Sequence, residues 1–162
     1  MVTSILPSAM RRLLLLSAAL LVSAAPHAQV QRGLVELGGS ASLQSTEGFT
    51  VFQFAPALGY FLTDALETGA RLNYVKFEGS DGDGALFVFA AYHFGRFRAT
   101  TVPFLEANLG TSVTGESDLV FGGRGGAKVF FLPGGALTAD GFIYTTGEVT
   151  TVGAEAGVSI FF

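Results

Sequence analysis

The sequence predicts an all-β protein: an eight-stranded antiparallel up-and-down transmembrane β-barrel preceded by a cleaved signal peptide. Three observations support this fold class. Charged residues make up only 14% of the 162 residues, whereas soluble domains carry about 25%. Apolar side chains alternate with small or polar ones along eight successive segments. No stretch beyond residue 28 approaches the roughly 20 consecutive apolar residues of a membrane-spanning helix.

Residues 1–28 have the organisation of a secretory signal peptide. Arg11 and Arg12 precede an apolar run rich in Leu, Ala and Val, and small residues lead to a cleavage point expected after Ala28. The apolar run is too short to span a membrane as a helix. The expected domains are therefore a signal peptide over 1–28 and a β-barrel over 29–162.

Composition excludes several classes of protein. The chain has no Cys, so neither disulfides nor thiolate metal sites are expected. Cleavage after residue 28 removes two of the nine basic side chains and none of the thirteen acidic ones, which makes the barrel more acidic than the whole chain with its net charge of −4. Nucleic acid is not an expected partner, because it requires a basic face.

The first four strands are expected over residues 33–44, 49–61, 65–77 and 85–94. The first three alternate large apolar residues with small or polar ones, as a strand with two unlike faces does, whereas the fourth is apolar on both faces. Pro56 falls within the second segment and predicts a bulge or a weakened ladder, because proline has no N–H to donate. Turn-forming residues separate the segments, including Thr63-Asp64 and the acidic, glycine-rich stretch 78–84.

The last four strands are expected over residues 102–113, 119–132, 136–145 and 151–162. Pro133, Gly134 and Gly135 indicate a sharp turn between the second and third of these. The final segment alternates strictly and ends on Phe162: its even positions are apolar, whereas its odd positions are mostly small or polar and include Glu155. Short strands at even spacing, joined by tight breaks, favour an up-and-down barrel.

Several short sequences in this order resemble a known family. They are FAPALGYFLTD at 54–64, Tyr92-His93-Phe94, PFLEANLG at 103–110, GGAKVFFL at 125–132 and the terminal Phe162. Together they resemble the small outer-membrane β-barrel domain family, which is related in architecture to outer-membrane proteins A, X and W. The resemblance implies a barrel in the cell outer membrane, in contact with lipid and lipopolysaccharide. It also implies folding by the barrel-assembly machinery, with Phe162 as assembly signal, and no catalytic residues or single shared activity.

The ionisable residues of the expected strands nearly all share the glycine-rich parity. They are Glu36, Glu67, Arg71, Glu106, Arg124, Lys128, Asp140 and Glu155. We expect this parity to face inward, because a soluble surface of Gly, Ser and so few charges would be poorly soluble. Desolvated carboxylates must be paired, so the residues predict an ion-pair network that fills the lumen.

The expected function is a structural or interaction role for a monomeric barrel, without a cofactor. Alternatives are a narrow ion channel opened by exchange of ion pairs, an exported soluble barrel that binds an apolar ligand, and a lipid-modifying enzyme. A wide pore is not expected, because an eight-stranded barrel has room only for its own side chains. Catalysis is not expected either, since His93 lies on the inward parity with no obvious Ser partner.

A metal site is not expected. His93 is the only histidine after the signal peptide, and a single histidine without Cys is a weak ligand set. The stretch from Asp81 to Gly84 reads as half of a calcium loop, but it lacks the twelve-residue spacing and the terminal Glu. It is interpreted as a solvated turn.

Overall fold

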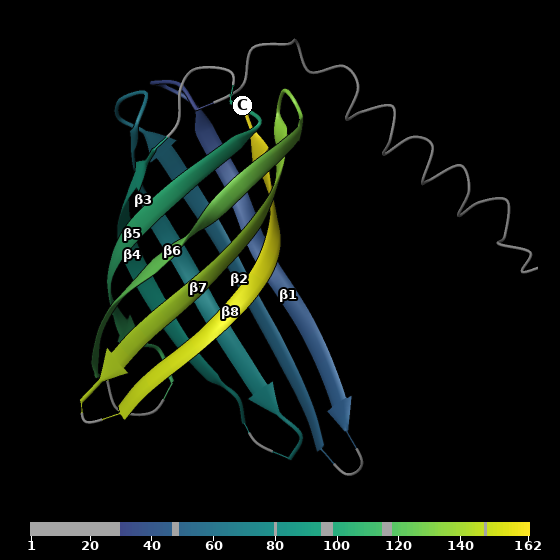
Figure 1. The fold of residues 1–162 in the computed structure, drawn as a ribbon. Helices are drawn as coiled ribbons and strands as arrows, with labels where there is room; N and C mark the ends of the chain where they lie inside the picture. Colours follow the sequence, from purple (N-terminus) through teal and green to yellow (C-terminus); the bar gives the residue numbers. More distant parts are fainter. Residues whose placement is uncertain (1–29, 47–48, 80, 95–98, 115–117, 148) are drawn as a thin grey trace, which may run out of the picture.

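The computed structural model describes residues 30–46, 49–79, 81–94, 99–114, 118–147 and 149–162. These residues form eight strands (Figure 1). In chain order the strands are β1 (Val35–Thr46), β2 (Phe49–Phe61), β3 (Leu66–Phe77), β4 (Asp83–His93), β5 (Thr101–Ser112), β6 (Leu119–Leu132), β7 (Gly135–Thr146) and β8 (Val149–Phe161). The signal peptide expected over 1–28 lies outside the described residues. Among the described residues, no helix has the length and apolarity needed to cross a membrane.

The eight strands close into one antiparallel barrel, which confirms the predicted fold. Each strand pairs with the next along the chain, and β1 pairs with β8. The closing ladder is short and runs from Glu36 opposite Phe161 to Gly39 opposite Val158. Along these four residue pairs closure removes the free sheet edge, which would otherwise expose unpaired backbone groups to lipid.

The barrel has two ends that differ in what they carry. Figure 1 places the C-terminus beside the ends of β2, β4 and β6, and we call this the terminal end. Strands β1, β3, β5 and β7 end at the opposite end of the barrel, which we call the loop end. At the terminal end, backbone N–H groups of Phe162 and Val35 donate to each other's carbonyl oxygens at 3.0 and 3.1 Å.

Side chains alternate between the interior and the outer face along the strands. Large apolar residues cover the outer face: Val88 is 61% exposed, Leu105 59% and Val158 51%, whereas Glu106 on the inward parity is 7% exposed. A soluble barrel with an apolar ligand would have the opposite arrangement. The predicted inversion, with apolar residues outside and charged residues inside, is therefore observed.

Two irregularities interrupt the ladders. The β2–β3 pairing passes from Phe54 to Ala57 without a partner for Pro56 and keeps its register on both sides. This confirms the predicted weakened ladder and shows that no bulge forms there. A register shift occurs instead in β6 between Phe130 and Leu132, next to the Pro133 turn, and the sequence did not predict it.

Candidate functional site: the charged interior

Ionisable side chains from β1, β3, β5, β6, β7 and β8 point into the barrel. They are Glu36, Glu67, Arg71, Glu106, Arg124, Lys128, Asp140 and Glu155. Alternation places them on one face of each strand, and closure of the barrel brings the strands around a common axis. They gather into two groups: one around Lys128, nearer the terminal end, and one around Arg124, nearer the middle.

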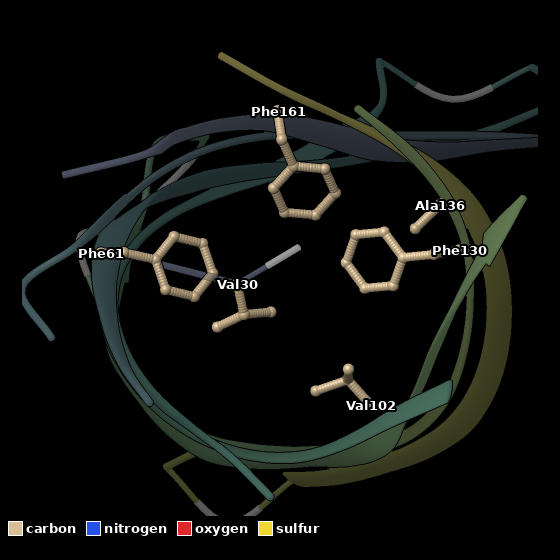
Figure 2. Close-up of a cluster of buried hydrophobic side chains, with 6 residues drawn as sticks. All are labelled: Val30, Phe61, Val102, Phe130, Ala136 and Phe161. Atoms are coloured by element: carbon tan, nitrogen blue, oxygen red, sulfur yellow. The ribbon is translucent and has the colours of Figure 1, made fainter. Parts of the chain in front are cut away.

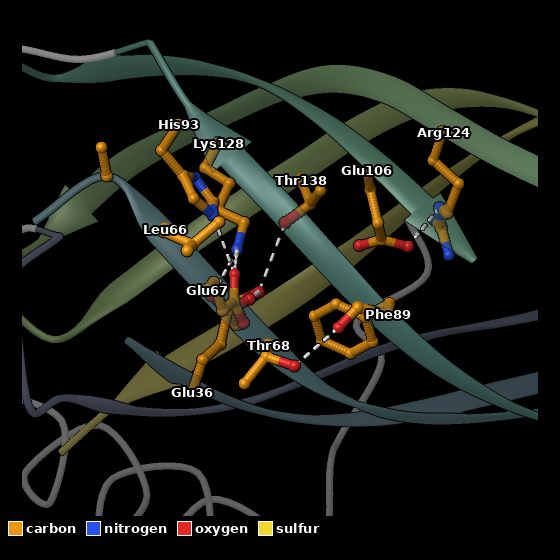
Figure 3. A network of polar contacts seen from close by, with 12 residues as sticks. Glu36, Leu66, Glu67, Thr68, Phe89, His93, Glu106, Arg124, Lys128 and Thr138 are labelled. Carbon is orange, nitrogen blue, oxygen red and sulfur yellow. Dashed lines mark hydrogen bonds and ion pairs between the residues drawn. The ribbon is translucent and has the colours of Figure 1, made fainter. Parts of the chain in front are cut away.

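The first group centres on the ammonium of Lys128 (Figure 3). Lys128 Nζ forms ion pairs with Glu36 and, at 3.3 Å, with Glu67. The second partner of the Glu67 carboxylate is His93, whose Nε2 lies 2.8 Å from Glu67 Oε2. Ser159 Oγ donates to Glu36 Oε1 at 2.7 Å. Each carboxylate of this group therefore has two partners, as burial demands.

Aromatic rings surround the same lysine. Lys128 Nζ lies 5.6 Å from the ring centroid of Phe104, 5.7 Å from that of Phe161 and 5.9 Å from that of Phe61. The negative face of an aromatic ring attracts a cation, and more strongly where water is excluded. The rings therefore supplement the two carboxylates and offset part of the cost of burying the ammonium.

The second group contains two arginines. Arg71 donates to both carboxylate oxygens of Glu106, with Nη2 at 3.2 Å from Oε2, which is the bidentate geometry that binds carboxylates most strongly. Arg124 Nε donates to Asp140 Oδ1 at 3.0 Å, and its Nη2 donates to Asp140 and Glu155. Arg124 Nε also lies 4.0 Å from Glu106 Oε1. This contact joins the two arginine pairs into one network.

Inward-facing glycines provide the room for these long side chains. A Cβ built on Gly59 would lie 1.7 Å from Glu67 Oε1, and one on Gly126 would lie 2.4 Å from Asp140 Cβ. Real Cβ atoms do not approach other atoms so closely. The glycine-rich parity noted in the sequence thus has a packing cause: carboxylates occupy space that other residues would fill.

Carboxylates outnumber cations in this interior. Five acidic side chains share Arg71, Arg124 and Lys128, with His93 as a further partner. A cavity of about 40 Å³ lies among them and is lined by residues of both groups. It exceeds the roughly 10–15 Å³ needed to hold a water molecule, so water has room to solvate the carboxylate oxygens that face it.

Apolar side chains close the interior at the terminal end (Figure 2). The closing cluster consists of Val30, Phe61, Val102, Phe130, Ala136 and Phe161. The rings of Phe130 and Phe161 have centroids 5.1 Å apart. Val30 precedes β1, and a backbone hydrogen bond of 2.8 Å from Gly33 to Phe61 attaches this segment to β2. The charged groups are therefore sealed from the terminal end by hydrocarbon.

The loop end is more open. Phe87, Val120 and Tyr144 form a second buried cluster beyond the arginine group, with Phe142 packed against it. Phe87 stacks on Tyr144 at 5.0 Å, and Phe142 stacks on Tyr144 at 5.2 Å. A cavity of about 430 Å³ lies at this end and extends down to Glu155.

The structure thus brings all eight sequence-derived residues into one interior. Sequence reasoning missed two members of the network, His93 and Ser159. The signal for His93 was its inward parity, which was considered only in relation to catalysis. Phe162 lies apart from the network, on the outer face, where it is 67% exposed. Among the described residues no cluster of His, Asp and Glu is arranged to hold a metal ion.

Comparisons with known proteins identify the architecture. Neither a family model nor a curated protein sequence matches the chain. Among solved structures, the N-terminal β-barrel domain of Pseudomonas aeruginosa OprF superposes with a TM-score of 0.64 at 18% identity, covering 81% of this chain and 98% of that domain. Neisserial surface protein A (NspA) superposes with a TM-score of 0.56 at 20% identity, covering 80% of this chain and 96% of NspA. Both are outer-membrane β-barrels. The chain therefore has the fold of a small outer-membrane β-barrel, with eight antiparallel strands closed around an ionic interior.

Proposed function

We propose that the protein resides in the bacterial outer membrane and has a structural or interaction role. The observation that carries the proposal is the outer face, where large apolar residues such as Val88, Leu105 and Phe121 are more than half exposed. Contact with lipid acyl chains gives these side chains an apolar environment, whereas exposure to water would be unfavourable for them. The likeness of the fold to the OprF barrel and NspA supports the same location.

The interior supports a role other than passive diffusion. Ion pairs fill the middle of the barrel, and the cluster around Phe61, Phe130 and Phe161 covers the terminal end. Cross-barrel pairs such as Lys128 with Glu36 connect strands that are far apart in the sequence. In this proposal they tie the barrel wall together, and the loops and outer face carry the interactions.

The proposed partners follow from these surfaces. They are outer-membrane lipid and lipopolysaccharide at the outer face, and the barrel-assembly machinery at the strand that ends in Phe162. The protein is proposed to be a monomer that neither binds nucleic acid nor acts as an enzyme. The burial of His93 against Glu67 inside the barrel supports the last point, because a lipid-modifying enzyme needs its base on the outer face.

Membrane fractionation combined with heat-modifiability on a gel tests this proposal. We expect the protein in the outer-membrane fraction, and we expect unheated samples to migrate differently from boiled ones because the barrel resists detergent. Recovery in the soluble periplasmic fraction would contradict the proposed location. Migration that does not change on boiling would contradict a stable barrel.

A narrow ion channel is the second candidate. It is favoured by Arg124, which lies within 4.0 Å of carboxylates on three strands, and by the small cavity beside it. In this candidate function, exchange of ion-pair partners between Arg124 and these carboxylates opens a narrow path for ions through the barrel. Conductance in planar bilayers distinguishes the candidates. Silence across voltages and salt concentrations supports the structural role, whereas discrete conductance that changes in Lys128→Gln supports the channel.

A further inference from the structure

We propose that the cavity at the loop end binds a small organic ammonium ion. Its volume of about 430 Å³ lies within the roughly 300–1,000 Å³ typical of small-molecule sites. Of the ion-pair network, only Glu155 lines this cavity, and Ser40, Ala55 and Glu155 line both this cavity and the smaller one among the ion pairs. The inference goes beyond the structural role proposed above and does not depend on it.

The charge of the cavity selects for a cation. Among the described residues that line it, Asp83 and Glu155 are the only ionisable carboxylates, and no Lys, Arg or His is present. Among the exposed charged residues near the loop-end strand termini, Glu78, Asp81 and Asp118 are acidic and Lys76 is basic, so the described residues there carry a negative balance. Such a field concentrates cations at the opening and repels anions.

Glu155 provides an anchor at the bottom of the cavity. Its Oε1 accepts from Arg124. The Glu155 side chain is 24% exposed, whereas the side chains of Arg124 and Asp140 beside it are 4% and 2% exposed. Of this group, Glu155 is therefore the carboxylate that a ligand entering from the loop end reaches.

An aromatic wall next to Glu155 indicates an organic cation rather than a metal ion. Tyr144 stacks on Phe87 and on Phe142, with ring centroids 5.0 Å and 5.2 Å apart, respectively. All three rings line the cavity. Aromatic faces bind alkylated ammonium groups through cation–π contact, whereas a metal ion prefers several oxygen ligands. Asn73 also lines the cavity, and its buried side-chain oxygen has no hydrogen-bond partner among the described residues, so a donor on the ligand would satisfy it.

Choline and its uncharged isostere 3,3-dimethylbutan-1-ol are the probes that test this inference. The protein is folded in maltoside micelles, since phosphocholine detergents would themselves present the cation. Backbone amide shifts of Phe142, Tyr144 and Thr151 are followed by NMR during titration. We expect saturable shifts with choline and a dissociation constant on the order of millimolar, with binding of the isostere at least about tenfold weaker.

Matched variants assign the binding to the cavity. Glu155→Gln keeps the shape and removes the charge, and we expect choline affinity to fall about tenfold or more. Asp140→Asn is the control, because it removes a carboxylate from the same Arg124 but does not line the cavity; we expect a change of less than about threefold. Phe142→Leu removes one aromatic face, and we expect a loss of about two- to fivefold.

Three results would overturn the inference. They are the absence of saturable shifts with choline up to roughly 50 mM, equal affinity for choline and the isostere, and unchanged affinity in folded Glu155→Gln. If Glu155→Gln does not fold, the isostere comparison and Phe142→Leu decide the matter. Because these titrations use detergent-solubilised protein, their outcome is independent of the membrane location proposed above.

Discussion

Gly59 of β2 leaves the space that the carboxylate of Glu67 on β3 occupies. A Cβ on Gly59 would lie 1.7 Å from Glu67 Oε1 and 2.8 Å from its Cδ. The same carboxylate contacts Lys128 and His93. The absence of a side chain at one position thus allows an ionic contact between strands that are not neighbours in the sheet.

We expect Gly59→Ala to destabilise the barrel. The added methyl displaces the Glu67 carboxylate from Lys128 and His93, and loss of one partner of a buried pair costs about 3–5 kcal/mol. Urea unfolding in lipid vesicles measures the change in the free energy of unfolding. Gly141→Ala is the matched control: the methyl would meet only the Gly153 carbonyl oxygen, at 3.6 Å. Equal stability of the two variants would show that Glu67 does not depend on this space.

Removal of Lys128 is expected to be more costly than removal of a surface lysine. Lys128→Met leaves Glu36 and Glu67 without their shared cation, and we expect a loss of about 3–5 kcal/mol in unfolding free energy. Lys76→Met, on an exposed residue of β3, is expected to change stability by no more than about 0.5 kcal/mol. Neutralising both acids in the Lys128→Met background should recover most of the loss. Absence of recovery would argue against electrostatic pairing.

A charge on the outer face is expected to destabilise the barrel according to its depth in the membrane. Val88 lies in the middle of β4 and Leu119 at the loop-end start of β6, and their exposures are nearly equal, at 61% and 63%. We expect Val88→Arg to cost about 2–4 kcal/mol and Leu119→Arg about 0–1 kcal/mol. Unfolding in lipid vesicles provides the measurement. Equal costs at the two positions would contradict a membrane-spanning orientation of the strands.

Phe162 is expected to act during assembly rather than in the folded state. It is exposed on the outer face at the end of the chain, so Phe162→Ser should change the stability of refolded protein by about 1 kcal/mol or less. We expect the amount of folded barrel in the outer membrane of cells to fall several-fold. Phe94→Ser alters another exposed aromatic residue at the terminal end and serves as the control. Equal amounts of folded barrel for the two variants would contradict a special role of Phe162 in assembly.

The side on which each residue lies could be predicted from the sequence, because strand periodicity leaves only two choices and the glycine-rich parity carries the charges. The bounds of β2 and β6 matched the predicted segments. Ladder register also places two like charges side by side: Asp140 is directly opposite Glu155, and both carboxylates accept from Arg124. The side that a residue faces and the bounds of a strand depend on neighbouring positions in the chain, so the alternating pattern of the sequence determines them.

The partners across the barrel could not be predicted in this way. Glu106 is opposite Arg124 in the β5–β6 ladder, yet it forms its bidentate contact with Arg71 of β3. Lys128 and Glu36 meet although 92 positions separate them. Such contacts depend on the tilt and closure of the whole sheet. Val30 was missed for a related reason: it precedes the first alternating segment, and only the closed barrel gives it a cluster to join.

Accessibility of spin labels along β8 tests the central claim most directly. The chain has no Cys, so single cysteines at successive positions from Val152 to Ile160 can each carry one nitroxide in lipid vesicles. We predict that even positions, including Val158, collide with lipid-soluble oxygen, whereas odd positions, including Glu155, are shielded from it. A reversed pattern, with Val158 shielded and Glu155 reached by oxygen from the lipid, or a pattern without period two, would contradict an apolar exterior around an ionic interior.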